Sequence, residues 1–249
     1  MEHQPTARVG MGMAQLDLSD MRKTWRRIFI KQAIVHCVDK IADRFYLITL
    51  QSASFKGRSW SAGQKVQIAM GSGFATRTYT PIDWNPATGV TRILGYAHGN
   101  GPGNDWLRNM RTGDQCDVLG PSVSLDLERV SGPIVVAGDE TSIGLAYALQ
   151  QEHIDVQVLL EVNAVEQAQA IANALQLRDV RFFLRSKDGA HLPDMARELK
   201  TLADDGATFV LTGNAESIQQ LRTGLKSMNV PSARQFTKAY WAPRKTGLD

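Results

Sequence analysis

The chain has 249 residues, of which 43% are hydrophobic and 21% are charged, a composition typical of a globular protein with a sizeable core. The formal net charge of +3 is too small to indicate nucleic-acid binding, and neither a run of basic residues nor a nucleic-acid motif accompanies it. The apolar runs are too short to span a membrane or to form a signal peptide, and two distant cysteines cannot build an iron–sulfur or zinc site, so we expect a cytoplasmic protein.

The first half of the chain predicts an antiparallel β-barrel. Residues 1–24 are interpreted as a flexible polar tail. Runs rich in Val, Ile, Phe and Tyr follow, bounded by Gly, Pro, Asn and Asp: Ile28–Val38, Arg44–Gln51, Lys65–Met70, Thr76–Pro81, Val90–Ala97, Gln115–Leu119 and Val123–Leu127. A short helix is expected over Asn104–Met110. Seven strands with one helix are typical of a barrel, which we predict over residues 25–129.

The second half predicts a parallel sheet with helices. Strands are expected in the run "GPIVVAG" and at Val156–Val162, Val180–Leu184 and Thr208–Leu211. Helices are expected between and after them, at Thr141–Gln151, Glu166–Leu175, Asp194–Ala203 and Ala215–Met228. This alternation indicates βαβ units, and short apolar strands are typical of a sheet buried on both faces. We predict a Rossmann-like nucleotide-binding α/β domain over residues 130–249.

Three glycines, Gly99, Gly101 and Gly103, precede the short helix of the barrel half. A helix N-terminus presents unpaired N–H groups and partial positive charge, and glycines let an anion approach them closely. The segment "GNGPGN" is therefore a candidate phosphate cradle, stiffened by Pro102. The structural alternative is a glycine-rich connection that Asn104 caps, because glycine motifs have weak specificity.

The segment "RTYTP" predicts a second part of the same site. Arg77 offers a planar fork suited to phosphate, and Tyr79 lies on the same face of a strand. Thr80 points the other way, but its hydroxyl or backbone N–H can reach a ligand lying along the strand. An arginine, an aromatic ring and a hydroxyl suit a flavin. The alternative is a half-buried strand with Tyr79 in the core and Arg77 in water.

Five motifs in order, "RTYT", "AHGNGPGNDW", "LGP", "VVAGDETSIG" and the late "YW", resemble the siderophore-interacting protein family. These are ferric-siderophore reductases of the ferredoxin–NADP reductase superfamily, and the resemblance covers roughly residues 25–247. It implies that Arg77 contacts the FAD pyrophosphate, that Tyr79 stacks on the isoalloxazine ring and that Thr80 hydrogen-bonds near flavin N5. Thr78 belongs to the same segment. A second phosphate and adenosine wall would consist of His98, Gly99, Gly101, Pro102, Gly103, Asn104 and Trp106, although core packing explains Trp106 equally well.

The resemblance also implies a nicotinamide site in the second half. The loop "GDET" would place Gly138, Asp139, Glu140 and Thr141 beside the nicotinamide and flavin, with Glu140 joining Tyr79 and Thr80 around the reacting atoms. Gly213 and Asn214 in the late "LTGN" loop, and Tyr240 and Trp241 in the tail, would complete the site. The structural alternative for "GDET" is a capped helix start.

The electron donor is open between NADH and NADPH. Glu161, near the end of the second strand of the parallel sheet, would favour the free 2′-hydroxyl of NADH. Arg185, Ser186 and Lys187 would hold a 2′-phosphate, and the prediction leans slightly to NADPH. Each of these side chains also fits a solvated surface charge, and an external ferredoxin donor is a further alternative.

The predicted activity is electron transfer from NAD(P)H through FAD to an Fe(III) chelate, which then releases Fe(II). Hydride chemistry belongs to the cofactors, and the scattered histidines have no metal-ligand spacing, so iron would arrive with its siderophore. Anionic chelates would be attracted by basic residues, for which the candidates are Lys56, Arg58, Lys238, Arg244 and Lys245. The alternatives are a general flavin reductase or diaphorase, a non-catalytic FAD- or siderophore-binding protein, and a structural protein without a ligand. We expect a monomer.

Overall fold

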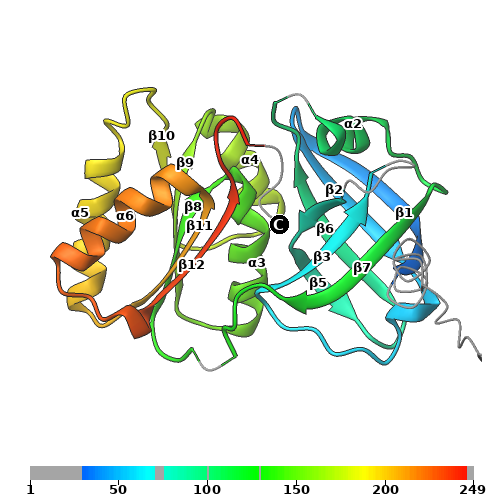
Figure 1. The fold of residues 1–249 in the computed structure, drawn as a ribbon, viewed down its shortest axis with the longest axis horizontal. Helices are drawn as coiled ribbons and strands as arrows, with labels where there is room; N and C mark the ends of the chain where they lie inside the picture. The colour runs from blue at the N-terminus through cyan, green and yellow to red at the C-terminus, as the bar shows by residue number, and fades with distance from the viewer. Residues whose placement is uncertain (1–29, 71–75, 100, 129, 246–249) are drawn as a thin grey trace, which may run out of the picture. The chain divides into compact units, whose positions relative to one another are not determined.

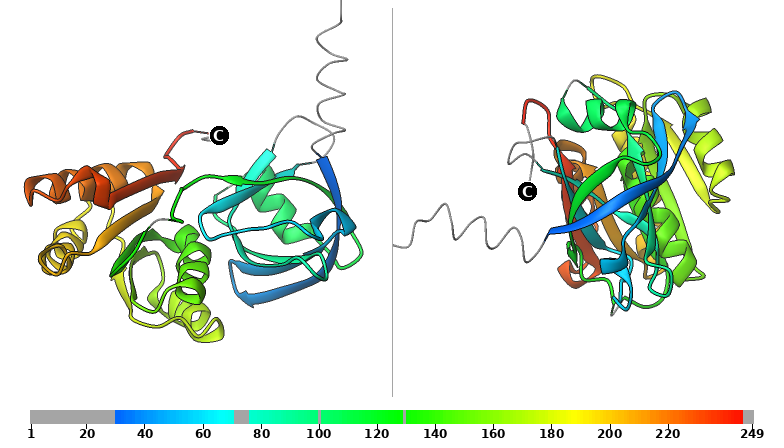
Figure 2. Two further views of the ribbon diagram at one scale, coloured as in Figure 1. Left: turned by 90° about the horizontal axis from the view of Figure 1, so that it is seen from below. Right: turned by 90° about the vertical axis from the view of Figure 1, so that its right-hand side faces the viewer.

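The first half of the chain folds into a seven-stranded antiparallel sheet that curls into a barrel (Figures 1 and 2). The computed structural model describes residues 30–245 except 71–75, 100 and 129. The strands are β1 (Ile30–Ala42), β2 (Phe45–Gln51), β3 (Gln64–Ala69), β4 (Thr76–Tyr79), β5 (Pro81–Asn85), β6 (Val90–Tyr96) and β7 (Gln115–Val123), in the order β4-β3-β7-β1-β2-β6-β5. The short helices η1 (Ala53–Phe55) and α2 (Pro102–Asn109) accompany them.

Alternate residues of the barrel strands form its core. Val35, Ile48, Ile68, Ile93 and Val118 are fully buried in one cluster, as strands with one inward face require. Leu107 of α2 joins this cluster, and it packs so closely against β6 that a Cβ on Gly95 would lie 2.2 Å from its Cδ2. The barrel core therefore fixes the position of α2, whose first turn carries the glycine-rich segment.

The second half is a five-stranded parallel sheet with helices on both faces. Its strands are β8 (Ile134–Asp139), β9 (Val156–Val162), β10 (Val180–Leu184), β11 (Thr208–Asn214) and β12 (Gln235–Trp241), in the order β10-β9-β8-β11-β12. The helices are η2 (Glu140–Ser142), α3 (Ile143–Glu152), α4 (Val165–Ala174), α5 (Leu192–Asp204), α6 (Ala215–Ser227) and η3 (Ser232–Arg234). Figure 2 shows α5 and α6 together on one face of the sheet, and α3 packs with α4 in the buried cluster of the other face.

The order of the parallel strands reverses between β8 and β11. The chain runs from β8 to β9 and β10 on one side, and from β11 to β12 on the other. Open parallel sheets bind ligands outside the carboxyl ends of their strands at such a reversal. Asp139 ends β8 and Asn214 ends β11, so the "GDET" and "LTGN" motifs lie at this point.

A single buried cluster joins the two sheets. Phe45 and Ile82 of the barrel belong to the same cluster as Ile143 and Ala146 of α3. The approach is close, because a Cβ on Gly144 would lie 3.1 Å from Cγ2 of Ile82. Consistent with this shared core, residues 31–249 cluster into one compact unit.

The predicted fold class, an antiparallel barrel followed by a parallel α/β sheet, is confirmed. One strand prediction was wrong, and two strands were missed. Val123–Leu127 is not a separate strand, because the backbone N–H groups of Ser124 and Leu125 both donate to the Gly63 carbonyl and turn the chain after β7. The other two errors are β5 and β12, which were not predicted.

The domain limits at residues 24 and 129 stay a prediction, and the polar tail lies outside the described residues. None of the described helices combines the length and apolarity needed to cross a bilayer.

Candidate functional site

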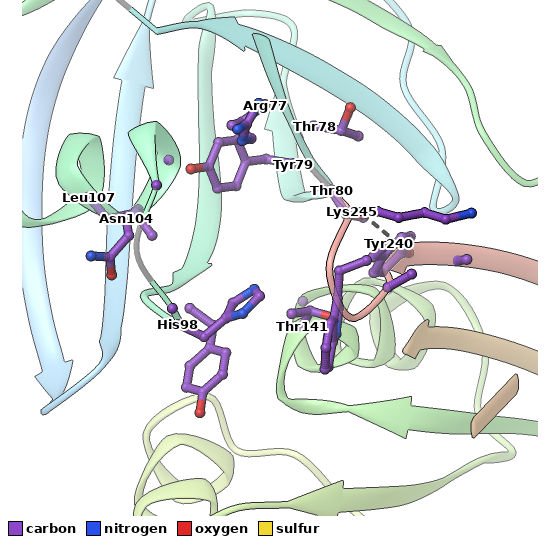
Figure 3. A pocket seen from close by; sticks show the side chains of 18 of the residues that line it. Arg77, Thr78, Tyr79, Thr80, His98, Asn104, Leu107, Thr141, Tyr240 and Lys245 are labelled. Carbon is purple, nitrogen blue, oxygen red and sulfur yellow. Dashed lines mark hydrogen bonds between the residues drawn. The ribbon is translucent and has the colours of Figure 1, made fainter. Parts of the chain in front are cut away.

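A cavity of about 450 Å³ contains most of the motifs that the sequence singled out (Figure 3). Its volume falls within the usual range of small-molecule sites. It is lined by β4, the segment after β6, the first turn of α2, the start of α3 and the end of β12. The predicted site residues in this lining are Arg77, Thr78, Tyr79, Thr80, His98, Gly99, Gly101, Gly103, Asn104, Thr141, Lys238, Tyr240, Trp241, Arg244 and Lys245.

The charge of the cavity has one sign. Its described lining contains four cationic side chains, Arg77, Lys238, Arg244 and Lys245, and no carboxylate. Arg77 comes from β4, whereas the other three come from the end of the chain. Low-dielectric walls with one sign of charge concentrate oppositely charged ligands. The cavity is therefore electrostatically suited to an anion.

The backbone just before α2 leaves open space beside Gly99 and Gly101. Gly101 is the N-cap and Pro102 follows as the first helical residue, where its missing N–H costs nothing. A Cβ added to Gly99 or Gly101 would meet no described atom within 4 Å, and Gly99 has a φ of +70° that favours glycine. This bare backbone at a helix N-terminus faces the cavity and can take an anionic group.

Asn104 and Gly103 connect this turn to β4. The Asn104 side chain is buried, and its Oδ1 has no hydrogen-bond partner among the described residues. A Cβ on Gly103 would lie 3.0 Å from Cγ of Arg77. The Arg77 side chain is thus packed against the α2 backbone, with its Nη1 donating to the Thr76 carbonyl at 2.7 Å. Two motifs that are separate in sequence form one wall.

Two tyrosines from the two sheets lie on either side of Thr80. The Tyr79 ring packs against Trp106, with ring centroids 5.5 Å apart, so Trp106 supports Tyr79 and is absent from the described cavity lining. The Thr80 hydroxyl donates to the Tyr240 hydroxyl at 3.4 Å. Burial raises the pKa of Tyr79 well above its usual value and the pKa of Tyr240 to about 12. Both phenols are therefore neutral donors at physiological pH.

Aromatic rings continue from the barrel core to the end of β12. Phe45 contacts Tyr96, Tyr96 stacks on His98 at 5.5 Å, and His98 contacts Trp241 at 5.4 Å between ring centroids. Burial lowers the pKa of His98, partly opposed by Glu140, so the imidazole is neutral at pH 7. Tyr96 was not predicted as a site residue, although it stands directly before the "AHGNG" segment.

Glu140 is held in a buried network next to the cavity. Its Oε1 accepts from the backbone N–H of Asn163 at 2.7 Å and from the Tyr96 hydroxyl at 3.3 Å. Its Oε2 pairs with Nη2 of Arg185 at 2.9 Å. Arg185 also donates to the Glu161 carbonyl at 3.1 Å. Because its side chain is buried and both of its oxygens are bonded to these neighbours, Glu140 is held in a fixed position.

The same network contains the residues weighed for the choice of donor. Glu161 is 1% exposed, and its Oε2 lies 2.6 Å from Nε2 of His191. The backbone N–H of Ser186 donates to Nδ1 of His191 at 3.2 Å, so Nε2 carries the proton that Glu161 accepts. Arg185 and Glu161 therefore bind each other and their neighbours, whereas Lys187 is exposed.

Some predicted site residues lie outside the cavity lining as described. Lys56 and Arg58 follow η1 on the barrel surface, where Nε of Arg58 donates to the Ser54 carbonyl at 2.8 Å. The other predicted residues that the lining lacks are Pro102, Trp106, Gly138, Asp139, Glu140, Gly213 and Asn214. Lining residues not predicted are Leu94, Tyr96, Leu107, Gly144, Ala239, Ala242 and Pro243, mostly small or apolar neighbours of the motifs. Among the described residues, no three His, Cys, Asp or Glu side chains are placed to hold a metal ion.

Comparisons with known proteins agree with the resemblance. Residues 133–244 match the family model of the siderophore-interacting proteins. The crystal structure of the siderophore-interacting protein SipS from Aeromonas hydrophila is 15% identical, with a TM-score of 0.71 over 88% of this chain and 93% of that one. The siderophore-interacting protein from Acinetobacter baumannii is 16% identical, with a TM-score of 0.70 over 87% and 92% of the two chains.

The FAD apo form of the ferredoxin reductase in carbazole 1,9a-dioxygenase is also similar. It is 16% identical, with a TM-score of 0.66 over 84% of this chain and 65% of that one. At such identities the likeness of the structures shows the fold alone, which is that of the ferredoxin reductases. A comparison with curated protein sequences finds no significant match. The resemblance drawn from the motifs is thus confirmed by the family match and by the shared fold.

Proposed function

We propose that this protein is an FAD-dependent reductase that passes electrons from NAD(P)H to the iron of a ferric siderophore. The reduced iron then leaves the siderophore as Fe(II). The observation that carries the proposal is the cavity, where "RTYT", the glycine-rich turn and the "YW" tail meet in one cationic site. The family match over residues 133–244 and the ferredoxin-reductase fold support it.

The residues of the barrel side fit FAD. Arg77 and the open backbone at Gly99 and Gly101 would hold the pyrophosphate, and the unpartnered Oδ1 of Asn104 would accept a hydrogen bond from a hydroxyl or N–H group of FAD. Tyr79 would lie against the flavin ring, with Thr80 hydrogen-bonding at its edge. When bound, FAD supplies the chemistry that accepts a hydride and passes single electrons on.

The parallel sheet would bind the donor at the reversal of its strand order. Thr141 and Trp241 line the cavity from that side. We propose NADPH or NADH as the donor, with ferredoxin as the alternative. Arg185 is already paired with Glu140 and Glu161, so it is not free to bind a 2′-phosphate, and the slight lean to NADPH rests on Ser186 and Lys187.

The chelate would be held by the cations at the end of the chain. Lys238, Arg244 and Lys245 line the cavity on β12 and just after it, apart from the wall that Arg77 forms with α2. Siderophore complexes of Fe(III) are usually anionic, and electron transfer needs no acid or base from the protein. Electrostatic attraction of the chelate to this rim is therefore the contribution that we assign to these three side chains.

The test is the visible spectrum of the purified protein, recorded without oxygen. Flavin bands are expected with FAD, bleaching after NADPH or NADH, and return of the bands after a ferric siderophore, with Fe(II) detected by a chromogenic chelator. Absence of flavin binding would refute the proposal.

Two alternative functions give different outcomes in this test. Bleached bands that return with free flavin or quinone, but not with ferric chelates, would indicate a general flavin reductase. Bands unmoved by either nucleotide would indicate another donor, which added reduced ferredoxin would test, or a binding protein.

A further inference from the structure

Asp139 is the most deeply buried acidic group of the site, and all its contacts are internal. It is 0% exposed and does not belong to the described cavity lining. Its Oδ1 accepts from the backbone N–H of Thr141 at 2.8 Å and from the Thr141 hydroxyl. Its Oδ2 accepts from the backbone N–H of Asn214 at 2.8 Å and from Nε1–H of Trp241 at 2.7 Å.

These bonds join the carboxyl ends of three neighbouring strands. Asp139 ends β8, Asn214 ends β11 and Trp241 ends β12. Two of the residues that donate to Asp139, Thr141 and Trp241, also line the cavity. One carboxylate thus fixes both the loop that opens α3 and the indole at the end of β12.

The glycines of the two motifs make this arrangement possible. A Cβ on Gly213, which has a φ of +101°, would lie 2.5 Å from Oδ2 and 2.6 Å from Cγ of Asp139. A Cβ on Gly138 would lie 2.5 Å from the Thr212 carbonyl. The "GDET" and "LTGN" glycines therefore let β8 and β11 approach closely around the carboxylate.

We propose that Asp139 is a positioning residue, which holds the Trp241 indole and the Gly213–Asn214 turn in place and so shapes the donor side of the cavity without touching the cofactors. The sequence had suggested direct contact with the nicotinamide and flavin. The assignment of the donor side rests on the proposed function. The hydrogen bond to Trp241 is independent of it.

Asp139→Asn leaves one neutral amide oxygen for the two pairs of donors that the carboxylate oxygens accept, so the hydrogen bond to Trp241 is either lost or weakened. Trp241→Phe keeps an aromatic ring and removes the indole N–H. Gly213→Ala adds a Cβ that would lie 2.5 Å from Oδ2 of Asp139, so the Asp139 carboxylate has to move. Asp155→Asn is the matched control, since Asp155 is exposed and directly precedes β9, at the amino ends of the strands and away from Asp139.

The first readout is the set of tryptophan indole N–H signals in a ¹H–¹⁵N correlation spectrum of the flavin-free protein. The chain has five tryptophans, and Trp241→Phe identifies the signal of Trp241 by its loss. That signal is expected downfield and protected from exchange. It should move in Asp139→Asn and Gly213→Ala, while the other indole signals keep their wild-type shifts, and it should stay in place in Asp155→Asn.

The second readout separates the donor from the flavin. Asp139→Asn and Trp241→Phe should each lower kcat/KM for flavin bleaching by NADH or NADPH about ten- to a hundred-fold, the cost of misplacing one wall by roughly an ångström. The Kd for FAD should stay at its wild-type value. The double variant should lose little more than either single variant, because both changes break one interaction.

Three results would overturn the proposal. One is an unmoved Trp241 signal in Asp139→Asn, another is an FAD Kd that rises together with the loss in bleaching rate, and the third is full additivity in the double variant. If no flavin binds to the wild-type protein, the proposed function and the donor-side role fail together. The indole signals then decide separately whether Asp139 holds Trp241.

Discussion

Replacing Gly103 by alanine should weaken FAD binding without weakening the fold. The new Cβ would lie 3.0 Å from Cγ and 3.4 Å from Cδ of Arg77, closer than most van der Waals contacts, so the arginine side chain has to shift. Gly103 lies in the first turn of α2, where alanine is a better helix former by about 0.5–1 kcal/mol. Gly103→Ala should therefore lower the affinity for FAD while it raises the stability of α2.

The size of the expected loss in FAD affinity follows from the strength of the hydrogen bond between Arg77 and the phosphate. A hydrogen bond to a charged group contributes about 1.5–3 kcal/mol, so losing one between Arg77 and phosphate raises the Kd for FAD about ten- to a hundred-fold. The assay is titration of the flavin-free protein with FAD, followed by flavin fluorescence, beside the Tm of the flavin-free protein.

The matched control for this substitution is Gly224→Ala in α6. Its Cβ would meet only Ala196 at 4.0 Å, so it should raise Tm and leave the Kd for FAD unchanged. An unchanged Kd in Gly103→Ala with a raised Tm would refute the role of Arg77. A joint loss of Tm and affinity would show instead that α2 cannot accommodate the methyl group.

Three further predictions concern the substrate rim, the shared core and pH. Lys238→Gln should raise the KM for an anionic ferric siderophore several-fold at low salt and leave a neutral ferric chelate unaffected, as steady-state kinetics at two ionic strengths would test; an equal effect on both chelates would contradict it. Ile82→Ala, at a site 1% exposed, should cost about 2–5 kcal/mol in urea unfolding, whereas Ile154→Ala, at a site 93% exposed, should cost almost nothing. Burial raises the pKa of Asp139 from 3.8 to about 6, so the folded state binds the extra proton, and the free energy of unfolding should fall by up to about 3 kcal/mol as pH rises from about 4 to 6; urea titrations of Asp139→Asn should lack this fall.

The parallel sheet was easier to predict than the edges of the fold. Val156–Val162 was predicted with the limits that it has, because a strand that is buried on both faces gives a largely apolar run between helices. β12 escaped prediction because its sequence, QFTKAYW, neither alternates polar with apolar residues nor forms an apolar run. β5 begins at Pro81 directly after Thr80, and no Gly, Asn or Asp separates it from β4 to indicate that one strand ends and another begins.

The sequence could predict the motifs of the site, but not which of their residues line it. The order of "RTYT", the glycines and the tail was enough to suggest one cavity. Whether a residue faces the ligand or supports the wall depends on contacts between distant strands. Asp139 and Gly213 are set back because β8 pairs with β11, and Glu140 because Arg185 and Asn163 reach it from other loops.

The buried cluster that contains Phe45, Ile82 and Ala146 limits how the two halves of this protein can be separated. If each sheet were expressed alone, it would expose the apolar face that the other one covers, and exposed faces of this kind promote aggregation. The two halves should therefore melt in one calorimetric transition. A chimaera with the α/β half of another protein of this fold would need matching residues on the barrel, starting with Ile82, which meets Gly144.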